Sequence, residues 1–286
     1  NENFSAIKKI SNIQNSGLCH SAINELYCLT LLKNFSNIIN LHNIEFTLDH
    51  VLIYMELYDM TLYDYLFEKR NKGDIITIGQ RLFEDISTGL YTIHTHGLIH
   101  KDIKSNNILI KFNSGNIVFS IIDFGTCGIF NNIYPIGSEG YIPPECTNIR
   151  NRIVTITKKI DVFAAGCCFY DYFYSFLKKN KIKYYYKISK FYSENYYGVE
   201  YPNKIVTAKL LDIDGIPDNF YEFMDNCLKI NPLDRFSTEN MCDFLNISSK
   251  INITNMNFLA RGFFKESSDT KLIMLNITQN WIIEVS

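Results

Sequence analysis

The middle of the chain reads Ile99-His100-Lys101-Asp102-Ile103-Lys104-Ser105-Asn106-Asn107, and Asp123-Phe124-Gly125 begins sixteen residues after Asn107. Apolar, strand-forming residues between these two stretches predict two short strands, at 108–111 and 118–122. The two polar stretches are therefore interpreted as loops on either side of a strand–loop–strand unit.

The acidic and amide side chains of these loops suit one kind of chemistry. Asp102, Asn107 and Asp123 supply oxygen atoms, which magnesium prefers as ligands. Phosphoryl transfer requires an acceptor hydroxyl that is oriented and relieved of its proton, and a metal that bridges the phosphates. Solvated loop carboxylates would explain either motif alone, but both motifs at this spacing favour phosphoryl transfer.

In these motifs the chain resembles the eukaryotic-type protein kinase superfamily, Ser/Thr branch, whose catalytic loop and metal motif match almost letter for letter. The resemblance implies that Asp102 is the catalytic base, that Lys104 contacts the γ-phosphate of ATP, and that Asn107 and Asp123 hold Mg. It also implies an α+β, bilobal protein kinase fold, with a small β-rich N-lobe and a larger, mainly α-helical C-lobe.

The nucleotide side of the family pattern precedes these motifs. Ser5-Ala6-Ile7-Lys8 resembles the strand whose lysine grips the α- and β-phosphates, and Glu25 lies where the family has its pairing glutamate. Met55-Glu56-Leu57-Tyr58 is similar to the gatekeeper and the hinge that binds adenine. Surface charges and a core methionine are the alternative explanations. The resemblance implies nucleotide contacts at Ala6, Lys8, Glu25, Met55, Glu56, Tyr58, Leu109 and Asp123.

Structural motifs of the same family follow these loops. The stretch 137–145, GSEGYIPPE, resembles the end of the activation segment, with Pro143 in place of the usual alanine. Asp161 resembles the aspartate that holds the catalytic-loop backbone, and Phe163 stands where the family has tryptophan. Arg235 lies where the family has an arginine paired with the activation-segment glutamate, here Glu145. We expect this pair to fix geometry more than to add net stability.

Two details bear on substrate and control. Lys104, two residues after the base, and the hydroxyl of Ser138 resemble the Ser/Thr branch, so we expect a protein substrate with a Ser or Thr acceptor. Lys101 replaces the arginine that usually precedes the base, and lysine cannot grip a phosphate with a planar fork. We therefore expect constitutive activity.

Hydrophobic periodicity outlines the domains. It predicts strands at 4–10 and 51–57 and helices at 21–34, 76–96, 160–177 and 219–228. We predict a partial N-lobe at 1–57, a C-lobe at 58–246, and a C-terminal extension of unknown role at 247–286.

Composition limits the partners and the compartment. The net charge of -2 supplies no global field for nucleic acid, so we expect nucleic-acid binding only if the basic-aromatic stretch from Lys178 to Lys187 provides it. A solvated surface is the simpler explanation of that stretch. No apolar run approaches the roughly 18 to 20 residues that cross a bilayer, and we expect no membrane partner.

The eight cysteines lack metal-ligand spacing, which favours reduced thiols in an intracellular compartment, the cytoplasm or nucleus. Abundant Asn, Ile, Lys and Tyr are typical of an AT-rich genome, such as that of a large DNA virus.

One departure opens a second hypothesis. The family places two strands and a glycine-rich loop before the phosphate-binding lysine, and no such loop precedes Lys8 in the printed sequence. The chain is either an active transferase whose printed sequence lacks these strands or a pseudokinase that acts as a binding, scaffold or decoy protein. The joint presence of the five motif residues favours the transferase, and we expect a glycine-rich loop upstream of Asn1. The five are Lys8, Glu25, Asp102, Asn107 and Asp123.

Overall fold

The computed structural model describes most of the chain up to residue 250. The described residues are 5–11, 18–47, 49–67, 74–113, 115–128, 137–138, 140–146, 156–177 and 216–250. The predicted C-terminal extension, apart from residues 247–250, and the stretch from Lys178 to Lys187 lie outside them.

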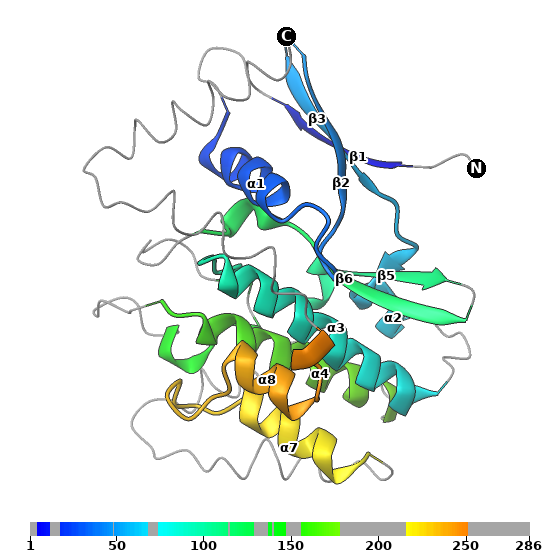
Figure 1. Ribbon diagram of the computed structural model, residues 1–286, viewed down its shortest axis with the longest axis vertical. Helices are drawn as coiled ribbons and strands as arrows, with labels where there is room; N and C mark the ends of the chain where they lie inside the picture. The colour runs from blue at the N-terminus through cyan, green and yellow to red at the C-terminus, as the bar shows by residue number, and fades with distance from the viewer. Residues whose placement is uncertain are drawn as a thin grey trace. The chain divides into compact units, whose positions relative to one another are not determined.

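The N-terminal part of the chain forms a three-stranded antiparallel sheet with helix α1 beside it (Figure 1). Strand β3 is central, because its alternate residues Val51 and Ile53 are fully buried while it pairs with β1 on one edge and β2 on the other. In this register Lys8 lies opposite Ile53. The elements are β1 (Ser5–Ser11), α1 (His20–Leu31), β2 (Leu41–Phe46) and β3 (His50–Glu56).

Strand β2 is an element that the sequence does not predict. Only Leu41 of its six residues is buried, and the strand carries a histidine, an asparagine and a glutamate. It pairs with β3 from Leu41 opposite Met55 to Phe46 opposite Val51, with a bulge after Leu41. Pairing with the apolar strand β3 therefore makes these residues a strand, because their own hydrophobic pattern does not predict one.

The second part of the chain is mainly helical and carries a small sheet, β4–β5–β6. Its longest helix, α3, is capped by Asp74, whose carboxylate accepts hydrogen bonds from the N–H groups of Ile76 and Thr77. The elements are β4 (Met60–Thr61), α2 (Leu62–Phe67), α3 (Ile75–Thr95), β5 (Ile108–Asn113), β6 (Asn116–Ile121), α4 (Lys159–Leu177), α7 (Asp218–Cys227) and α8 (Thr238–Phe244), with short 3-10 turns η1 (Ser105–Asn107), η2 (Phe124–Thr126), η3 (Pro144–Cys146) and η5 (Ser248–Lys250).

Helices α3, α4 and α7 meet at a cluster of phenylalanine rings. The ring centroid of Phe83 on α3 lies 4.6 Å from that of Phe169 on α4 and 4.8 Å from that of Phe223 on α7. All three rings are fully buried, and tilted aromatic pairs add to the hydrophobic gain of burial. This core fixes α4 against α3, and α4 carries Asp161 beneath the catalytic loop.

The architecture confirms the bilobal α+β fold that the sequence predicts. The expected strands and helices all occur, with bounds that differ by at most three residues. The sequence misses helices α2 and α8, because six and seven residues are too short to display a clear helical period. Among the described residues, no helix has the length and apolar character needed to cross a membrane.

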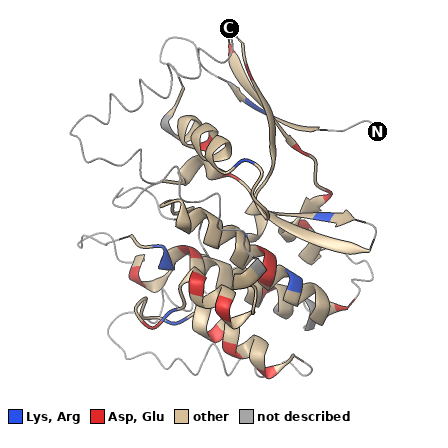
Figure 2. Cartoon of the chain, viewed as in Figure 1, with Lys and Arg blue, Asp and Glu red and all other residues tan. Residues whose placement is uncertain are grey.

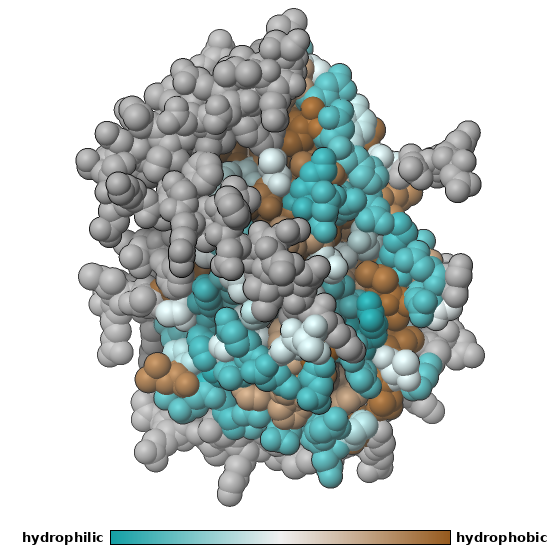
Figure 3. Space-filling view, viewed as in Figure 1, coloured by the Kyte–Doolittle hydropathy of each residue, from teal (hydrophilic) through white to brown (hydrophobic). Residues whose placement is uncertain are grey.

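The described surface mixes polar and apolar groups. Figure 2 shows acidic residues along α7 and α8, namely Asp218, Glu222, Asp225, Glu239 and Asp243. Figure 3 shows hydrophobic surface near α2 and β5, where Phe67 and Phe112 are exposed.

Candidate active site

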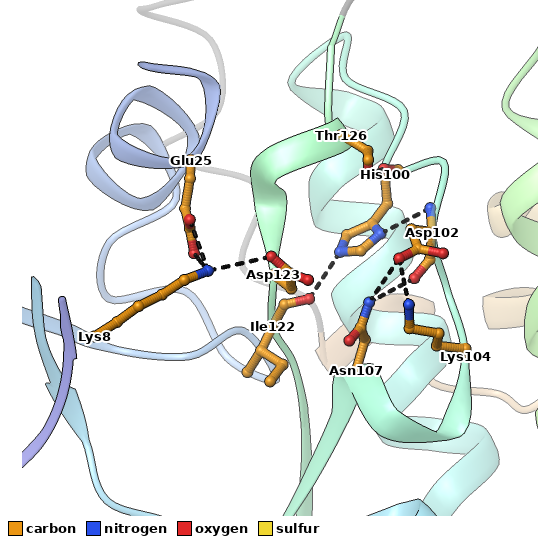
Figure 4. A network of polar contacts seen from close by, with 9 residues as sticks. All are labelled: Lys8, Glu25, His100, Asp102, Lys104, Asn107, Ile122, Asp123 and Thr126. Carbon is orange, nitrogen blue, oxygen red and sulfur yellow. Dashed lines mark hydrogen bonds and ion pairs between the residues drawn. The ribbon is translucent and has the colours of Figure 1, made fainter. Parts of the chain in front are cut away.

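The loop between α3 and β5 gathers polar side chains around Asp102. Figure 4 shows Lys104 and Asn107 pointing at its carboxylate; Lys104 Nζ donates to Oδ2 at 2.6 Å and Asn107 Nδ2 to the same oxygen at 3.2 Å. The Ser138 hydroxyl donates to the other oxygen, Oδ1, at 2.8 Å and accepts from Lys104 Nζ at 2.7 Å. Both oxygens of Asp102 are engaged, so the orientation of the carboxylate is fixed from two sides.

Asn107 is oriented by the backbone of the same loop. Its Nδ2 also donates to the Asp102 carbonyl oxygen at 2.9 Å, which leaves Oδ1 as the side-chain atom able to coordinate a cation. The Ile122 N–H donates to the Asn107 carbonyl at 3.0 Å, next to the paired strands β5 and β6. This bond places Asn107 beside the residue that precedes Asp123.

Asp123 adopts a left-handed backbone conformation, with φ 66° and ψ 74°. Side-chain-bearing residues rarely adopt it, and aspartate is among those that tolerate it best. The next residue, Phe124, is fully buried, whereas the Asp123 side chain is 43% exposed and lies 3.3 Å from Lys8 Nζ. Together with Asn107 Oδ1, its carboxylate forms a set of hard oxygen donors on adjacent strand ends, which fits Mg²⁺.

The His100 side chain forms hydrogen bonds to both the Asp102 loop and the Asp123 loop. Its Nδ1 accepts a hydrogen bond from the Asp102 N–H at 3.3 Å, so Nε2 carries the proton and donates to the Ile122 carbonyl at 3.0 Å (Figure 4). Burial lowers the pKa of the imidazole, which agrees with this neutral form. The ring also lies 5.1 Å from the Phe124 ring. His100 therefore sets the spacing between the Asp102 loop and the Asp123 loop.

Asp161 at the start of α4 holds the catalytic loop, as the resemblance implies. Its carboxylate accepts hydrogen bonds from the backbone N–H of His100 at 2.8 Å and of Lys101 at 2.9 Å, and from His94 Nε2 at 2.9 Å. Burial alone raises the pKa of this carboxyl, but the His94 bond and the backbone donors outweigh it, so the pKa is lowered. Lys101, whose N–H donates to this carboxylate, has a left-handed backbone conformation with φ 70°.

Lys8 of β1 and Glu25 of α1 form an ion pair next to Asp123. Lys8 Nζ lies 2.6 and 2.8 Å from the two Glu25 oxygens (Figure 4), and the Glu25 side chain is 6% exposed. Burial works against the Lys8 charge, but the Glu25 hydrogen bonds and the nearby carboxylates raise the pKa of Lys8 above its usual value. Lys8 is therefore a fixed cation that faces Asp123.

The residues expected around adenine lie on two sheets and on the segment between them. Ala6 and Met55 are opposite each other in the pairing of β1 with β3. Leu109 of β5 lies opposite Ser120, and the Tyr58 hydroxyl is 2.8 Å from Ser120 Oγ. Ala6 and Met55 belong to the N-terminal sheet and Leu109 to the small sheet, whereas Tyr58 lies in the segment between β3 and β4.

The Glu56 side chain forms an ion pair beside the hinge. Its Oε1 is 2.5 Å from Lys111 Nζ, and this ammonium also lies over the Tyr58 ring at 5.7 Å. The carboxylate is thus engaged beside the small sheet, and the hinge role implied for Glu56 rests on its backbone alone.

Arg235 and Glu145 form the pair that the resemblance implies. Nη1 and Nη2 of Arg235 donate to the two Glu145 oxygens at 2.7 and 3.0 Å. The other three N–H groups donate to backbone carbonyls of Lys229, Lys159 and Ile230, so all five donors are used. The guanidinium also lies 4.9 Å from the centre of the Phe163 ring. This site joins η3 of the activation segment to the helical lobe.

The sequence did not point to His94, which binds Asp161, or to the hydrogen bonds of His100. His94 lies 67 positions before Asp161, within the amphipathic helix α3, and a histidine on a buried helical face was the only available signal. Residues 129–136 and 139 of the activation segment lie outside the described residues, so the expected constitutive activity stays a prediction.

The chain is also similar in sequence to known proteins. A family model described as "Protein kinase domain" matches residues 1–245. The chain is 28% identical over 176 residues to "MAPK/MAK/MRK overlapping kinase" of Homo sapiens, which covers 59% of this chain and 38% of that protein. It is 28% identical over 238 residues to "Dual specificity protein kinase Ttk" of Danio rerio, covering 77% of this chain and 22% of the relative. The chain thus spans less than half the length of these relatives. The matched region includes every motif of the site, and the chain belongs to the protein kinase domain family.

Proposed function

We propose that the chain is a serine/threonine protein kinase that transfers the γ-phosphoryl group of ATP to a protein hydroxyl. The arrangement around Asp102 carries the proposal, because its carboxylate is held by Lys104, Asn107 and Ser138. The oxygen-donor pair formed by Asn107 Oδ1 and the Asp123 carboxylate belongs to the same site. The Lys8–Glu25 pair stands over that oxygen pair. A chain used only for binding would have no chemical reason to hold all these groups in register.

The protein's own residues divide the work of transfer. Asp102 orients the acceptor hydroxyl and takes its proton, and Lys104 balances charge that develops on the transferred group. Asn107 and Asp123 would hold Mg²⁺, which together with ATP supplies the bridged phosphates. Lys8, fixed by Glu25, would bind the α- and β-phosphates. Catalysis in this class is mainly positioning and charge stabilisation, which matches a site whose groups are each held by at least one neighbour.

The nucleotide base would bind between the N-terminal sheet and the small sheet, which the hinge residues connect. Ala6, Met55 and Leu109 supply half-buried apolar side chains, and Glu56 and Tyr58 supply backbone groups. The Tyr58 N–H donates to no backbone carbonyl among the described residues, which supports a role as adenine donor.

A serine or threonine acceptor is favoured by Lys104 and Ser138. Their mutual hydrogen bond at 2.7 Å completes a polar wall beside Asp102, which suits a short hydroxyl side chain that enters close to the base. Relatives of the chain are named as serine/threonine and dual-specificity kinases, which is consistent with this choice.

The test is transfer of radiolabelled γ-phosphate to generic protein acceptors. We expect magnesium-dependent labelling of casein, histone or myelin basic protein, with the label on phosphoserine and phosphothreonine after acid hydrolysis. Asp123→Asn serves as the matched control, because the variant keeps the side-chain size and loses the metal-binding charge. Tight ATP or protein binding without any labelling would favour the pseudokinase hypothesis instead.

A further inference from the structure

We propose that Ser138 is an intramolecular phosphoryl acceptor, and that its phosphorylation limits the activity of the chain. This inference rests on the proposed function, because it uses the same base and the same ATP site. It assigns a modification site within the activation segment.

The Ser138 hydroxyl already meets two requirements of an acceptor. Its O–H donates to Asp102 Oδ1 at 2.8 Å, so the group proposed as base is in place to receive the proton. Its oxygen also accepts from Lys104 Nζ at 2.7 Å, next to the cation proposed to contact the γ-phosphate. Both contacts are made within one chain, between residues 36 positions or fewer apart.

Other hydroxyls of the described activation segment are turned to different partners. The Thr126 hydroxyl donates to the His100 carbonyl at 3.0 Å. The Tyr141 hydroxyl lies 2.9 Å from Ser105 Oγ and 3.2 Å from Asp171. Neither of these contacts involves the base, whereas Ser138 makes its hydrogen bond to the base itself.

A local turn holds Ser138 in this position. Gly137 and Gly140 both have positive φ, 68° and 101°, which glycine adopts without strain. The Tyr141 N–H donates to the Ser138 carbonyl at 3.1 Å and closes the turn. Because glycine lies immediately before Ser138, the turn also has backbone freedom to move the hydroxyl a short way toward a bound phosphate.

The transfer step is balanced with ATP as donor. Ser138 Oγ forms a bond to the γ-phosphorus, the bond from that phosphorus to the β,γ-bridging oxygen breaks, the hydroxyl proton passes to Asp102, and ADP leaves. A phosphoryl oxygen bound to Lys104 Nζ would lie within roughly 5 to 6 Å of Ser138 Oγ, given ordinary hydrogen-bond lengths. Attack needs an approach of about 3 to 3.5 Å. The turn must therefore shift, and we expect transfer to Ser138 to be slower than transfer to a bound protein substrate.

Phosphorylation at this position would oppose further catalysis. A phosphoserine carries a charge of about -1.5 to -2 at neutral pH, and here it would stand beside the Asp102 carboxylate. It would also capture Lys104, which the next γ-phosphate needs. We therefore expect each modified chain to lose activity, so that the reaction limits itself.

The experiment follows Ser138 occupancy and activity together. Phosphatase-treated chain is incubated with Mg-ATP at several protein concentrations, and phosphopeptide mass spectrometry measures the modified fraction over time. We expect a first-order rate that does not change with protein concentration. Labelling of casein should fall at least about tenfold as occupancy approaches completion, because a dianion then faces the base, and phosphatase should restore it.

Variants separate this inference from the proposed function. Ser138→Thr should be modified at the same position, and Ser138→Ala should show no label there. Asp123→Asn chain mixed with wild-type chain tests for intermolecular transfer, and phosphate on Ser138 of the inactive chain would overturn the intramolecular route. If casein is labelled while Ser138 stays unmodified, Ser138 only orders Asp102 and Lys104, and the inference fails while the proposed function stands. If neither is labelled, the proposed function fails with it.

Discussion

Removal of the Glu145 carboxylate should destabilise the chain far more than the loss of an ordinary ion pair. The Arg235 side chain is fully buried, and Glu145 receives two of its five N–H groups. In Glu145→Ala, the guanidinium keeps its three carbonyl partners but loses its counter-charge and two hydrogen bonds. Arginine stays protonated, so the charge cannot be relieved by releasing a proton.

The size of the effect follows from burial. Breaking a buried pair by removing one partner costs about 3 to 5 kcal/mol, because an uncompensated charge remains inside. The Glu145 side chain is 19% exposed, so water reaches the vacated side. We therefore expect a loss near the lower end, about 3 kcal/mol in the free energy of unfolding.

Denaturant unfolding measures this loss, provided that the dependence on denaturant stays the same. The matched control is Lys111→Gln, which breaks the Glu56–Lys111 pair; these side chains are 29% and 32% exposed. Ion pairs that solvent reaches contribute about 1 kcal/mol or less. If Glu145→Ala costs no more than Lys111→Gln, the buried arginine does not hold the activation segment as argued.

Three further predictions concern single side chains. Lys8→Met should raise the Kd for ATP at least about tenfold by calorimetry, since a charge-assisted contact to phosphate is lost; an unchanged Kd would contradict its phosphate role. Asp123→Asn should abolish magnesium-dependent transfer while its Tm barely moves, because the carboxylate is exposed and faces Lys8; normal turnover at saturating magnesium would refute the metal assignment. Burial raises the pKa of Asp171 to about 7, so the folded state holds this proton more tightly than the unfolded state, and stability falls as the pH rises from about 4 to 7. Asp171→Asn should lessen the fall in unfolding free energy between pH 5 and pH 8, and an unaltered fall would show that Asp171 titrates normally.

The candidate site could be predicted largely because its residues lie in short, local motifs. Asp102, Lys104 and Asn107 fall within six consecutive positions, and Asp123 follows one strand pair later. Their spacing is set by the chain itself, so the sequence carries it directly. Pairings such as Lys8 with Glu25 came only through resemblance, because a contact between a strand and a helix leaves no local pattern.

Features that depend on packing could not be predicted in the same way. Strand β2 exists because β3 offers an apolar partner, and the polar residues of β2 hide it. The bond from His94 to Asp161 spans 67 positions and requires α3 to pack on α4. The raised pKa of Asp171 reflects burial by the completed fold, which outweighs the hydrogen bond that Tyr141 donates to it. Each of these features is decided by neighbours remote in sequence.

The central claim is that Asp102 accepts the proton of a protein hydroxyl during phosphoryl transfer. Its most direct test compares Asp102→Asn with the wild-type chain, with kcat measured by γ-phosphate transfer to casein and the Kd for ATP measured by calorimetry. The variant keeps side-chain size and still accepts a hydrogen bond from Lys104, so the loop should stay folded. The account predicts a fall in kcat of about 10² to 10⁴, with little change in the Kd for ATP, because this carboxylate acts on the acceptor alone. A normal kcat, or a large rise in the Kd for ATP with kcat unchanged, would contradict it.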